Sequence, residues 1–167
     1  SYSSDGSSLA GLVAKNTGLS VVVKAETAPT LALTASDLTV SGDTITGFSP
    51  AGLAKVNAVT VTGTSIKFPA DLAATKIGKS AFSKKFKNKK VKIELPDSNT
   101  EIGDSAFASN SAITAVKFGS TPTSSKLKTI GAKAFYEAGL AENIKFPDGL
   151  ETLKDDCFAK NELTSVT

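Results

Sequence analysis

Ile102-Gly103-Asp104-Ser105-Ala106-Phe107 is one of three copies of the phrase Ile-Gly-x-x-Ala-Phe in this chain. The other two copies begin at Ile77 and Ile130, and a degenerate fourth copy runs from Leu153 to Phe158. A sequence that repeats with a period in the twenties predicts a solenoid, in which each unit buries its apolar face only by stacking on the next. The phenylalanines that end the four copies lie 25, 28 and 23 residues apart, at Phe82, Phe107, Phe135 and Phe158.

Each unit also contains a short stretch in which apolar and polar residues alternate. This alternation predicts strands whose apolar residues enter the core while the residue between them faces solvent, and the proline that often follows closes the strand. A fifth strand is predicted to begin at residues 163–166. The four preceding stretches are Ile66-Lys67-Phe68-Pro69, Ile93-Glu94-Leu95-Pro96, Val116-Lys117-Phe118-Gly119 and Ile144-Lys145-Phe146-Pro147.

The rest of each unit is a polar turn, a second short extended piece that ends at Ile-Gly, and the Ala-Phe pair. In Asp104-Ser105-Ala106-Phe107 the Asp and Ser are residue types that begin helices, so Ala-Phe is predicted to lie in a single short helical turn. The four phenylalanines should then stack in one column. The fold class predicted is a β-rich repeat solenoid with short helical turns and parallel ladders along its axis.

The first part of the chain does not share the repeat. Residues 9–14 are compatible with a short helical turn, and residues 19–24 and 30–40 resemble strands. Solenoids need a terminal cap over the open end of the core, so residues 1–42 are interpreted as a β-containing N-terminal cap or as the tail of a preceding domain. Residues 43–167 are assigned to the solenoid, which we expect to be truncated at its C-terminal end because residue 167 falls where the next strand should begin.

Composition excludes several classes of chemistry. The chain of 167 residues has no His, which excludes Ser-His-Asp triads and His-dependent metal sites, and its single Cys excludes an internal disulfide and a thiolate zinc cluster. No phosphate-binding glycine loop or calcium loop is present, so neither cofactor nor metal is expected. Cys157 replaces the small Ala of the Ala-Phe pair and is interpreted as a buried, inert residue.

These motifs resemble the BspA-like, or spirochaete-type, leucine-rich-repeat family, whose repeat reads roughly L-x-x-I-x-L-P-x-x-L-x-x-I-G-x-x-A-F. Residues 93–107 follow that template closely. Residues 144–158 keep its spacing, while Leu153, Lys154 and Cys157 replace the Ile, Gly and Ala. The resemblance covers residues 59–167 and implies a right-handed coil with short parallel strands. It also implies a bacterial cell-surface or secreted protein, in a family that includes adhesins, and it supplies no catalytic residue.

The first candidate binding surface is a row on the predicted sheet. Adjacent parallel strands lie about 4.8 Å apart, so the solvent-facing residues before the last apolar position should form one line. Glu94 between two lysines is expected to form cross-strand pairs, whereas Lys117 beside Lys145 leaves that end free to meet an anion. The alternative interpretation is a charged face that prevents aggregation. The row consists of Lys67, Glu94, Lys117 and Lys145.

The second candidate is a lysine-rich loop, which we define as residues 83–90. Such runs bind sulfated glycans, phosphates or anionic lipid heads, whereas the alternative interpretation, which is favoured, is a solvated loop that ends a helix. The loop has no Arg, and Phe86 is its only residue able to stack on a base, so nucleic acid is not an expected partner. No stretch is long enough to insert into a membrane. The candidate ligand-binding residues of this loop are Lys84, Lys85, Lys87, Lys89 and Lys90.

The function favoured is a non-catalytic surface module that adheres to a host matrix protein, to other cells or to an anionic glycan. A structural spacer within a larger surface protein, with no ligand of its own, is the main alternative. A polysaccharide-acting enzyme is the remote one, because such chemistry needs two carboxylates that face each other across about 5–9.5 Å. Asp155 and Asp156 are adjacent in sequence, and nothing marks a cleft around them.

Overall fold

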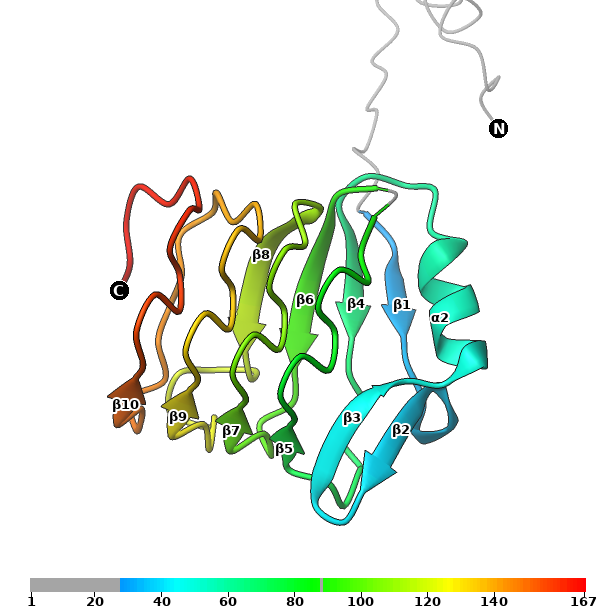
Figure 1. Ribbon diagram of the computed structural model, residues 1–167, viewed down its shortest axis with the longest axis horizontal. Coiled ribbons are helices and arrows are strands. Elements are labelled where there is room, and N and C mark those ends of the chain that lie inside the picture. Colours follow the sequence, from blue (N-terminus) through cyan, green and yellow to red (C-terminus); the bar gives the residue numbers. More distant parts are fainter. Residues whose placement is uncertain (1–27, 88) are drawn as a thin grey trace, which may run out of the picture.

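The computed structural model describes residues 28–87 and 89–167, which form a solenoid with two rows of strands (Figure 1). The helical turn predicted at residues 9–14 and the strand at 19–24 lie outside the described residues. Sheet A runs in the order β1-β4-β6-β8, and sheet B in the order β10-β9-β7-β5-β3-β2. All neighbours are parallel except β2 and β3, which form an antiparallel hairpin. The repeat solenoid predicted from the sequence is confirmed.

Three units contribute one strand to each sheet. The first coil holds β4 (Thr64–Lys67) and β5 (Lys76–Ile77), and the second holds β6 (Val91–Leu95) and β7 (Glu101–Ile102). The third coil holds β8 (Ile113–Phe118) and β9 (Thr129–Ile130). The fourth coil adds only β10 (Thr152–Leu153) to sheet B. Its other predicted strand is reduced to a single bridge between Ile144 and Val166.

The four phenylalanines form the predicted column inside the solenoid. The Phe82 and Phe107 ring centroids lie 5.3 Å apart, those of Phe107 and Phe135 5.2 Å, and those of Phe135 and Phe158 5.4 Å. The ring planes of the last two pairs are nearly parallel, with angles of 6° and 7° between them. Phe82, Phe107 and Phe135 are fully buried, whereas Phe158 at the end of the column is partly exposed. The column is therefore the centre of the core that runs through all four units.

The Ala-Phe segments are turns and not helices, which corrects the prediction of short helical turns. Each turn contains two residues with left-handed backbone, such as Ser80 and Lys84, with φ of 54° and 59°. Alternate N–H groups donate outward to the next coil, as from Phe82 to the Ala106 carbonyl at 2.8 Å. Bonds between coils thus replace the i→i−4 bonds of a helix. The turns span residues 79–84, 104–109, 132–137 and 155–160.

The glycine of Ile-Gly lets neighbouring coils approach closely. A Cβ placed on Gly103 would lie 2.8 Å from the backbone of Gly78 in the preceding coil. The N–H of Gly103 donates to the Ile77 carbonyl at 2.8 Å, so the two backbones are in direct contact here. Glycine at this corner of the second coil leaves no side chain between the two backbones.

Two asparagines link neighbouring coils at the opposite end of the turn, Asn110 after the second turn and Asn161 after the fourth. Asn110 is fully buried; its Nδ2 donates to the carbonyls of Phe82 and Phe107 at 2.9 and 2.8 Å, and its Oδ1 accepts from Phe86 N–H at 3.0 Å. Asn161 makes equivalent bonds between the third and fourth coils. Sequence reasoning did not identify these residues, although both stand three positions after the repeat phenylalanine.

The N-terminal side of the solenoid is covered by β1 (Thr30–Ala32), the 3-10 turn η1 (Ala35–Asp37), the β2–β3 hairpin (Leu38–Ser41 and Thr44–Phe48) and helix α2 (Pro50–Asn57). The strand predicted over residues 30–40 is therefore interrupted by η1. Helix α2 was not predicted, although Ser49 accepts from Gly52 N–H as its N-cap and is followed by a proline in the first turn. The boundary proposed between residues 42 and 43 falls in the hairpin turn and stays a prediction.

Asp37 fixes this cap from inside. It is 1% exposed, with Lys55 Nζ at 2.8 Å from Oδ1 and 2.9 Å from Oδ2, and the Thr34 N–H donates to Oδ2 at 2.8 Å. Burial alone would raise the pKa of Asp37, but the hydrogen bonds from Lys55 and Thr34 outweigh it and lower the pKa below its usual 3.8. The carboxylate thus joins η1 to α2 as an ion.

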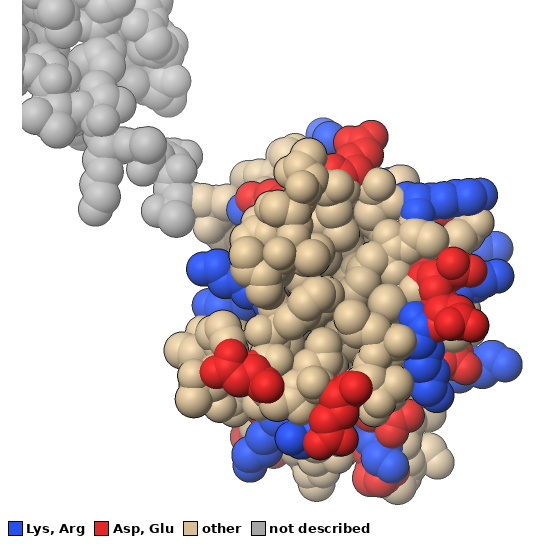
Figure 2. All heavy atoms as spheres, turned by 90° about the vertical axis from the view of Figure 1, so that its left-hand side faces the viewer, with Lys and Arg blue, Asp and Glu red and all other residues tan. Residues whose placement is uncertain are grey.

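The opposite end of the solenoid is formed by the fourth coil. Figure 2 views this end and shows mainly uncharged surface, with Lys, Asp and Glu gathered toward its margins. Leu153 and Val166 of this coil are 46% and 53% exposed. Within the described residues β10 is the terminal strand of sheet B.

Candidate functional site

The outer face of sheet A carries the row predicted from the sequence. Lys67 of β4 pairs in register with Glu94 of β6, and Glu94 pairs with Lys117 of β8. The intervening apolar residues point inward, since Ile66 and Phe68 are 0% and 2% exposed. Lys145 is exposed and lines the same depression as Lys117, but it belongs to no ladder with β8. The structure therefore brings all four residues to one face, three of them in strict register.

The cross-strand ion pairs expected of Glu94 are not formed in the described part of the chain, which corrects that prediction. An acidic residue of the fourth coil instead pairs across the strands: Glu142 Oε1 lies 3.2 Å from Lys92 Nζ. The two residues reach each other over Ala115, whose small side chain lies opposite Lys92 in the register. Exposed ion pairs of this kind contribute only about 0.2–1 kcal/mol, so register alone does not decide which partner a lysine takes.

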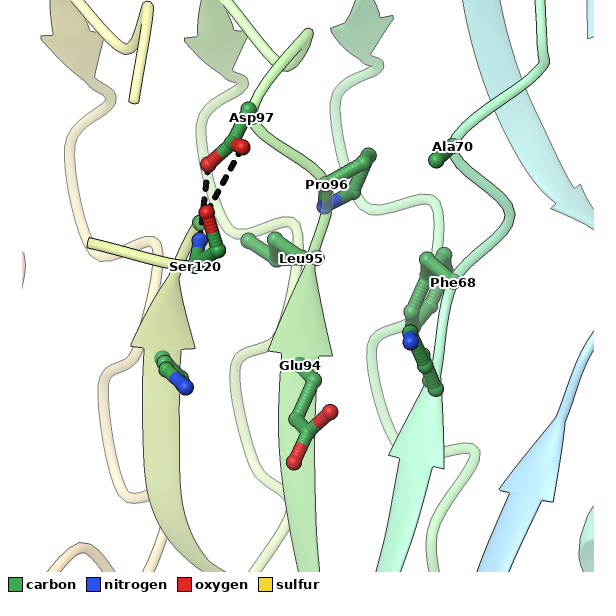
Figure 3. Close-up of a pocket in the computed structure, with 10 residues that line it drawn as sticks. Phe68, Ala70, Glu94, Leu95, Pro96, Asp97 and Ser120 are labelled. Carbon is green, nitrogen blue, oxygen red and sulfur yellow. Dashed lines mark hydrogen bonds between the residues drawn. The ribbon is translucent and has the colours of Figure 1, made fainter. Parts of the chain in front are cut away.

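One depression lies where the strands of sheet A end, with a volume of about 230 Å³ (Figure 3). Glu94 projects from the central strand, Pro96 and Asp97 follow it, and Ser120 enters from the neighbouring coil. Lys67 and Lys117 also line it, so the predicted row forms one side. The depression is mixed in charge, with the carboxylates of Glu94 and Asp97 and the ammonium groups of Lys67 and Lys117 among its lining groups.

Asp97 organises the long turn of the third unit, residues 120–126. Its Oδ1 accepts from the Ser120 N–H at 2.7 Å, and its Oδ2 accepts from the Ser120 hydroxyl at 2.7 Å. The Ser124 hydroxyl also donates to Oδ1, at 3.1 Å. The hydrogen bonds from Ser120 lower the pKa of Asp97 below its usual 3.8. This insertion, which interrupts the sequence period, is thus folded against the second coil and forms part of the wall seen in Figure 3.

A second depression, of about 330 Å³, lies on the same face between β8 and the fourth coil. Lys92, Lys117 and Lys145 stand around it, together with Glu94 and Glu142. Neither Lys117 nor Lys145 has an ion-pair partner among the residues that the structure describes. This side of sheet A therefore holds an excess of positive charge.

The lysine-rich loop lies at the other end of sheet A, immediately before β6. Phe86 is 3% exposed, its ring centroid lies 5.7 Å from that of Phe48, and its N–H donates to Asn110. It anchors the loop in the core and is not accessible for stacking on a base. The loop follows a turn, so the interpretation as a helix end is wrong. The lysines around it are all exposed: Lys84, Lys85, Lys87, Lys89 and Lys90.

The remaining candidate chemistry lies in the fourth coil. Cys157 is 8% exposed, as predicted, and burial raises the pKa of its thiol. Asp155 and Asp156 are exposed. Within residues 28–87 and 89–167, no group of three or more His, Cys, Asp or Glu side chains is placed to hold a metal ion. Over the same residues, no helix has the length and apolar character needed to cross a membrane.

Comparison with known proteins agrees with this architecture. A family model described as the BspA type leucine rich repeat region matches residues 59–167, in six copies. The chain belongs to the BspA-type leucine-rich-repeat family. The matched region contains all four copies of the Ile-Gly-x-x-Ala-Phe phrase and both depressions on sheet A, so both candidate surfaces lie on the repeat itself and not on the cap.

A solved structure is also similar to this BspA-type chain. It is the crystal structure of a leucine rich cell surface protein from Faecalibacterium prausnitzii A2-165, with 18% sequence identity and a TM-score of 0.45. The similarity covers 77% of this chain and 48% of that one, so this chain spans about half the length of its structural relative. No curated protein matches the chain.

Proposed function

We propose that this BspA-type repeat is the interaction module of a bacterial cell-surface protein, and that the outer face of sheet A is its contact surface. The observation that carries the proposal is the division of residues between inside and outside. The apolar residues of the repeat phrase are buried in the core, with Ile102, Ala106 and Phe107 all 0% exposed. The outer face, in contrast, presents lysines without ion-pair partners among the described residues, beside two depressions.

The physical character of this face suits an acidic partner. All 19 basic residues of the chain are lysines, whose charges are compact and lie on flexible stems. Parallel strands hold Lys67 and Lys117 on either side of Glu94 at a fixed spacing, which orders the bases of these stems before a partner arrives. A rigid sheet that presents charges in a row loses less conformational entropy on binding than a mobile loop does.

The lysine-rich loop is a second basic surface, and it needs its own test. Lys90 precedes β6 and Glu94 lies near its end, so the loop and the predicted row occupy opposite ends of the same strand. Each residue of a strand advances about 3.3 Å, which separates the two surfaces by roughly 13 Å. Substitutions in one surface therefore leave the other unchanged.

The test is adhesion of the whole chain to immobilised matrix proteins, to other bacteria and to anionic glycans. A sheet-face variant carries Lys67→Glu, Lys117→Glu and Lys145→Glu. Its matched control carries Lys79→Glu, Lys126→Glu and Lys154→Glu, three exposed lysines outside the row with the same change in net charge. A loop variant changes Lys84, Lys85, Lys87, Lys89 and Lys90 to Glu.

We expect the sheet-face variant to lose adhesion while the control retains it. Equal adhesion by both would remove sheet A from the proposal, and a loss confined to the loop variant would move the contact surface there. Wild type that adheres to none of the targets would favour a structural spacer. Turnover of a polysaccharide, abolished by one carboxylate-to-amide substitution, would instead support an enzyme.

A further inference from the structure

Sheet A stops at β8, although the solenoid continues. The fourth coil bonds to β8 only near its start, where the Thr114 carbonyl accepts from the Ala141 and Glu142 N–H groups at 3.1 and 3.4 Å. Beyond that point the ladder is not continued, and Ile144 pairs instead with Val166. A gap in the hydrogen-bonded sheet therefore lies between β8 and the segment 143–146.

The gap leaves the backbone N–H and C=O of one residue, Val116, without a partner. Ala115 and Lys117 pair with Lys92 and Glu94 of β6, so Val116, which lies between them, directs its N–H and C=O to the opposite side. Neither group makes a hydrogen bond within the described residues, and Val116 as a whole is 8% exposed. Buried backbone groups are almost always paired, so this donor and acceptor are suited to a ligand that supplies both partners.

The larger of the two depressions on sheet A lies over this gap in the ladder. Val116 lines it beside the small Ala115, and Lys92, Lys117 and Lys145 surround it. Its volume of about 330 Å³ lies at the lower end of the range for small-ligand sites, roughly 300–1,000 Å³. Lys92 is paired with Glu142 at 3.2 Å, which leaves the ammonium groups of Lys117 and Lys145 for a ligand.

We propose that this depression binds one acidic sugar residue, with its carboxylate or sulfate between Lys117 and Lys145 and its ring over Ala115. The inference rests on the proposed function and names its ligand class. Two features select a sugar over an acidic side chain. An ionised Asp or Glu side chain only accepts hydrogen bonds, and its peptide donates only through the backbone N–H. A sugar hydroxyl beside the anion both donates and accepts, as the free N–H and C=O of Val116 require. The site also accommodates a ring-sized group beside the charge.

Binding is tested on the whole chain with four probes: oligogalacturonate, which carries carboxylates; dextran sulfate, which carries sulfate esters; neutral dextran; and poly-glutamate. Titration calorimetry at low and high salt gives the affinities. The first two probes distinguish a carboxylate from a sulfate ester as the anion. Neutral dextran offers the sugar ring without charge, and poly-glutamate offers the charge without the ring. We expect an acidic glycan to bind, with weaker binding as salt rises, and both dextran and poly-glutamate to bind at least about tenfold more weakly.

Two variants test the location. Lys117→Gln with Lys145→Gln should weaken binding about tenfold, because each partly exposed charge contact contributes little alone. Lys79→Gln with Lys154→Gln is the control of equal charge and should bind as wild type does. Ala115→Phe fills the depression without changing charge, and aromatic residues are favoured in strands, so it should abolish binding while the melting temperature is retained.

Three results would overturn the inference: equal affinity for poly-glutamate, equal weakening by the control pair, or undiminished binding by Ala115→Phe. If no acidic glycan binds but adhesion to a matrix protein still depends on the sheet-face lysines, the sugar site is wrong and the proposed function stands. If adhesion is also absent, both fail together.

Discussion

Replacing Asn110 by Ala should destabilise the solenoid more than any other single change of a polar side chain on the repeat. The side chain is 0% exposed and satisfies three backbone groups of two coils: the carbonyls of Phe82 and Phe107 and the N–H of Phe86. Alanine cannot replace any of these bonds. The substitution therefore leaves three buried polar groups unpaired at the junction of the first and second coils.

The magnitude follows from those three groups. A buried donor or acceptor that loses its partner costs about 1–3 kcal/mol, so the lower bound for the set is about 3 kcal/mol. For a chain of this length, each kcal/mol lowers the melting temperature by about 2–4 °C, which predicts a decrease of about 6–12 °C. Ser111→Ala, an exposed neighbour in the same corner, should change stability by less than about 0.5 kcal/mol.

The assay is urea unfolding of the wild type, Asn110→Ala and Ser111→Ala, followed by circular dichroism and by thermal melting. Asn110→Asp adds a test of the chemistry, because a carboxylate in this position has no N–H for the Phe82 and Phe107 carbonyls. Burial would raise the pKa of the introduced carboxyl, so its protonated form is favoured in the folded state and the loss should shrink as pH falls. A loss below about 1 kcal/mol for Asn110→Ala, or a loss equal to that of Ser111→Ala, would refute the reasoning.

Three further predictions concern the cap, the core and the corner. Asp37→Asn should lower the free energy of unfolding by about 1–3 kcal/mol at neutral pH. Because the pKa of Asp37 is lowered in the folded state, the stabilisation from its carboxylate is present above pH 3.8 and is lost as pH falls through the folded pKa. The unfolding curves of the wild type and the variant should therefore converge in acid. Phe107→Ala should cost about 3–5 kcal/mol in urea unfolding, and Phe158→Ala less, since Phe158 has a ring neighbour in the column on one side only and is partly exposed; equal losses would contradict a continuous stack. Gly103→Ala should lower the melting temperature because the new Cβ would lie 2.8 Å from the backbone of Gly78. The control Gly42→Ala has open space around its Cβ and should show only the strain of its left-handed backbone. An unchanged melting temperature for Gly103→Ala would contradict the close contact.

The features that the sequence predicted well depend on apolar periodicity. Ile66, Ile93 and Val116 recur before each strand end, and the phenylalanines recur after each Ile-Gly. A buried residue in a solenoid must meet its equivalents in the adjacent coils, so the same type is required in each unit. The strand register of Lys67, Glu94 and Lys117 follows from the same constraint, because the residue between two buried positions must point outward.

The features that were missed depend on bonds between coils. Asp104-Ser105 is a local helix signal, but the N–H of Phe107 finds its acceptor in the Ala134 carbonyl of the next coil, so the segment becomes a turn. From the sequence, Asn110 has the character of an ordinary surface turn residue. In the structure it is fully buried, because the neighbouring coil packs against it. Glu94 failed as an ion-pair partner because exposed charges are too weakly coupled for register to decide their pairing.

The missed features also explain why the repeats are irregular. Asn110 bonds the second coil to the first, and Asn161 bonds the fourth to the third, but Ala138 holds the corresponding position in the third coil. The junction between the second and third coils therefore lacks an asparagine link. That junction is where Asp97 holds the inserted turn through Ser120.

The insertion and the asparagines thus have complementary places in the solenoid. Asparagine links occupy the first and third junctions at the corner after each turn, and the Asp97 network occupies the second junction at the end of the sheet A strands. The same insertion closes one side of the depression in Figure 3. The second depression lies where the ladder breaks after β8. Departures from the repeat therefore coincide with the two hollows of the outer face. The repeated residues build the stacked core of the solenoid, and the residues that break the repeat shape the two depressions on its outer face.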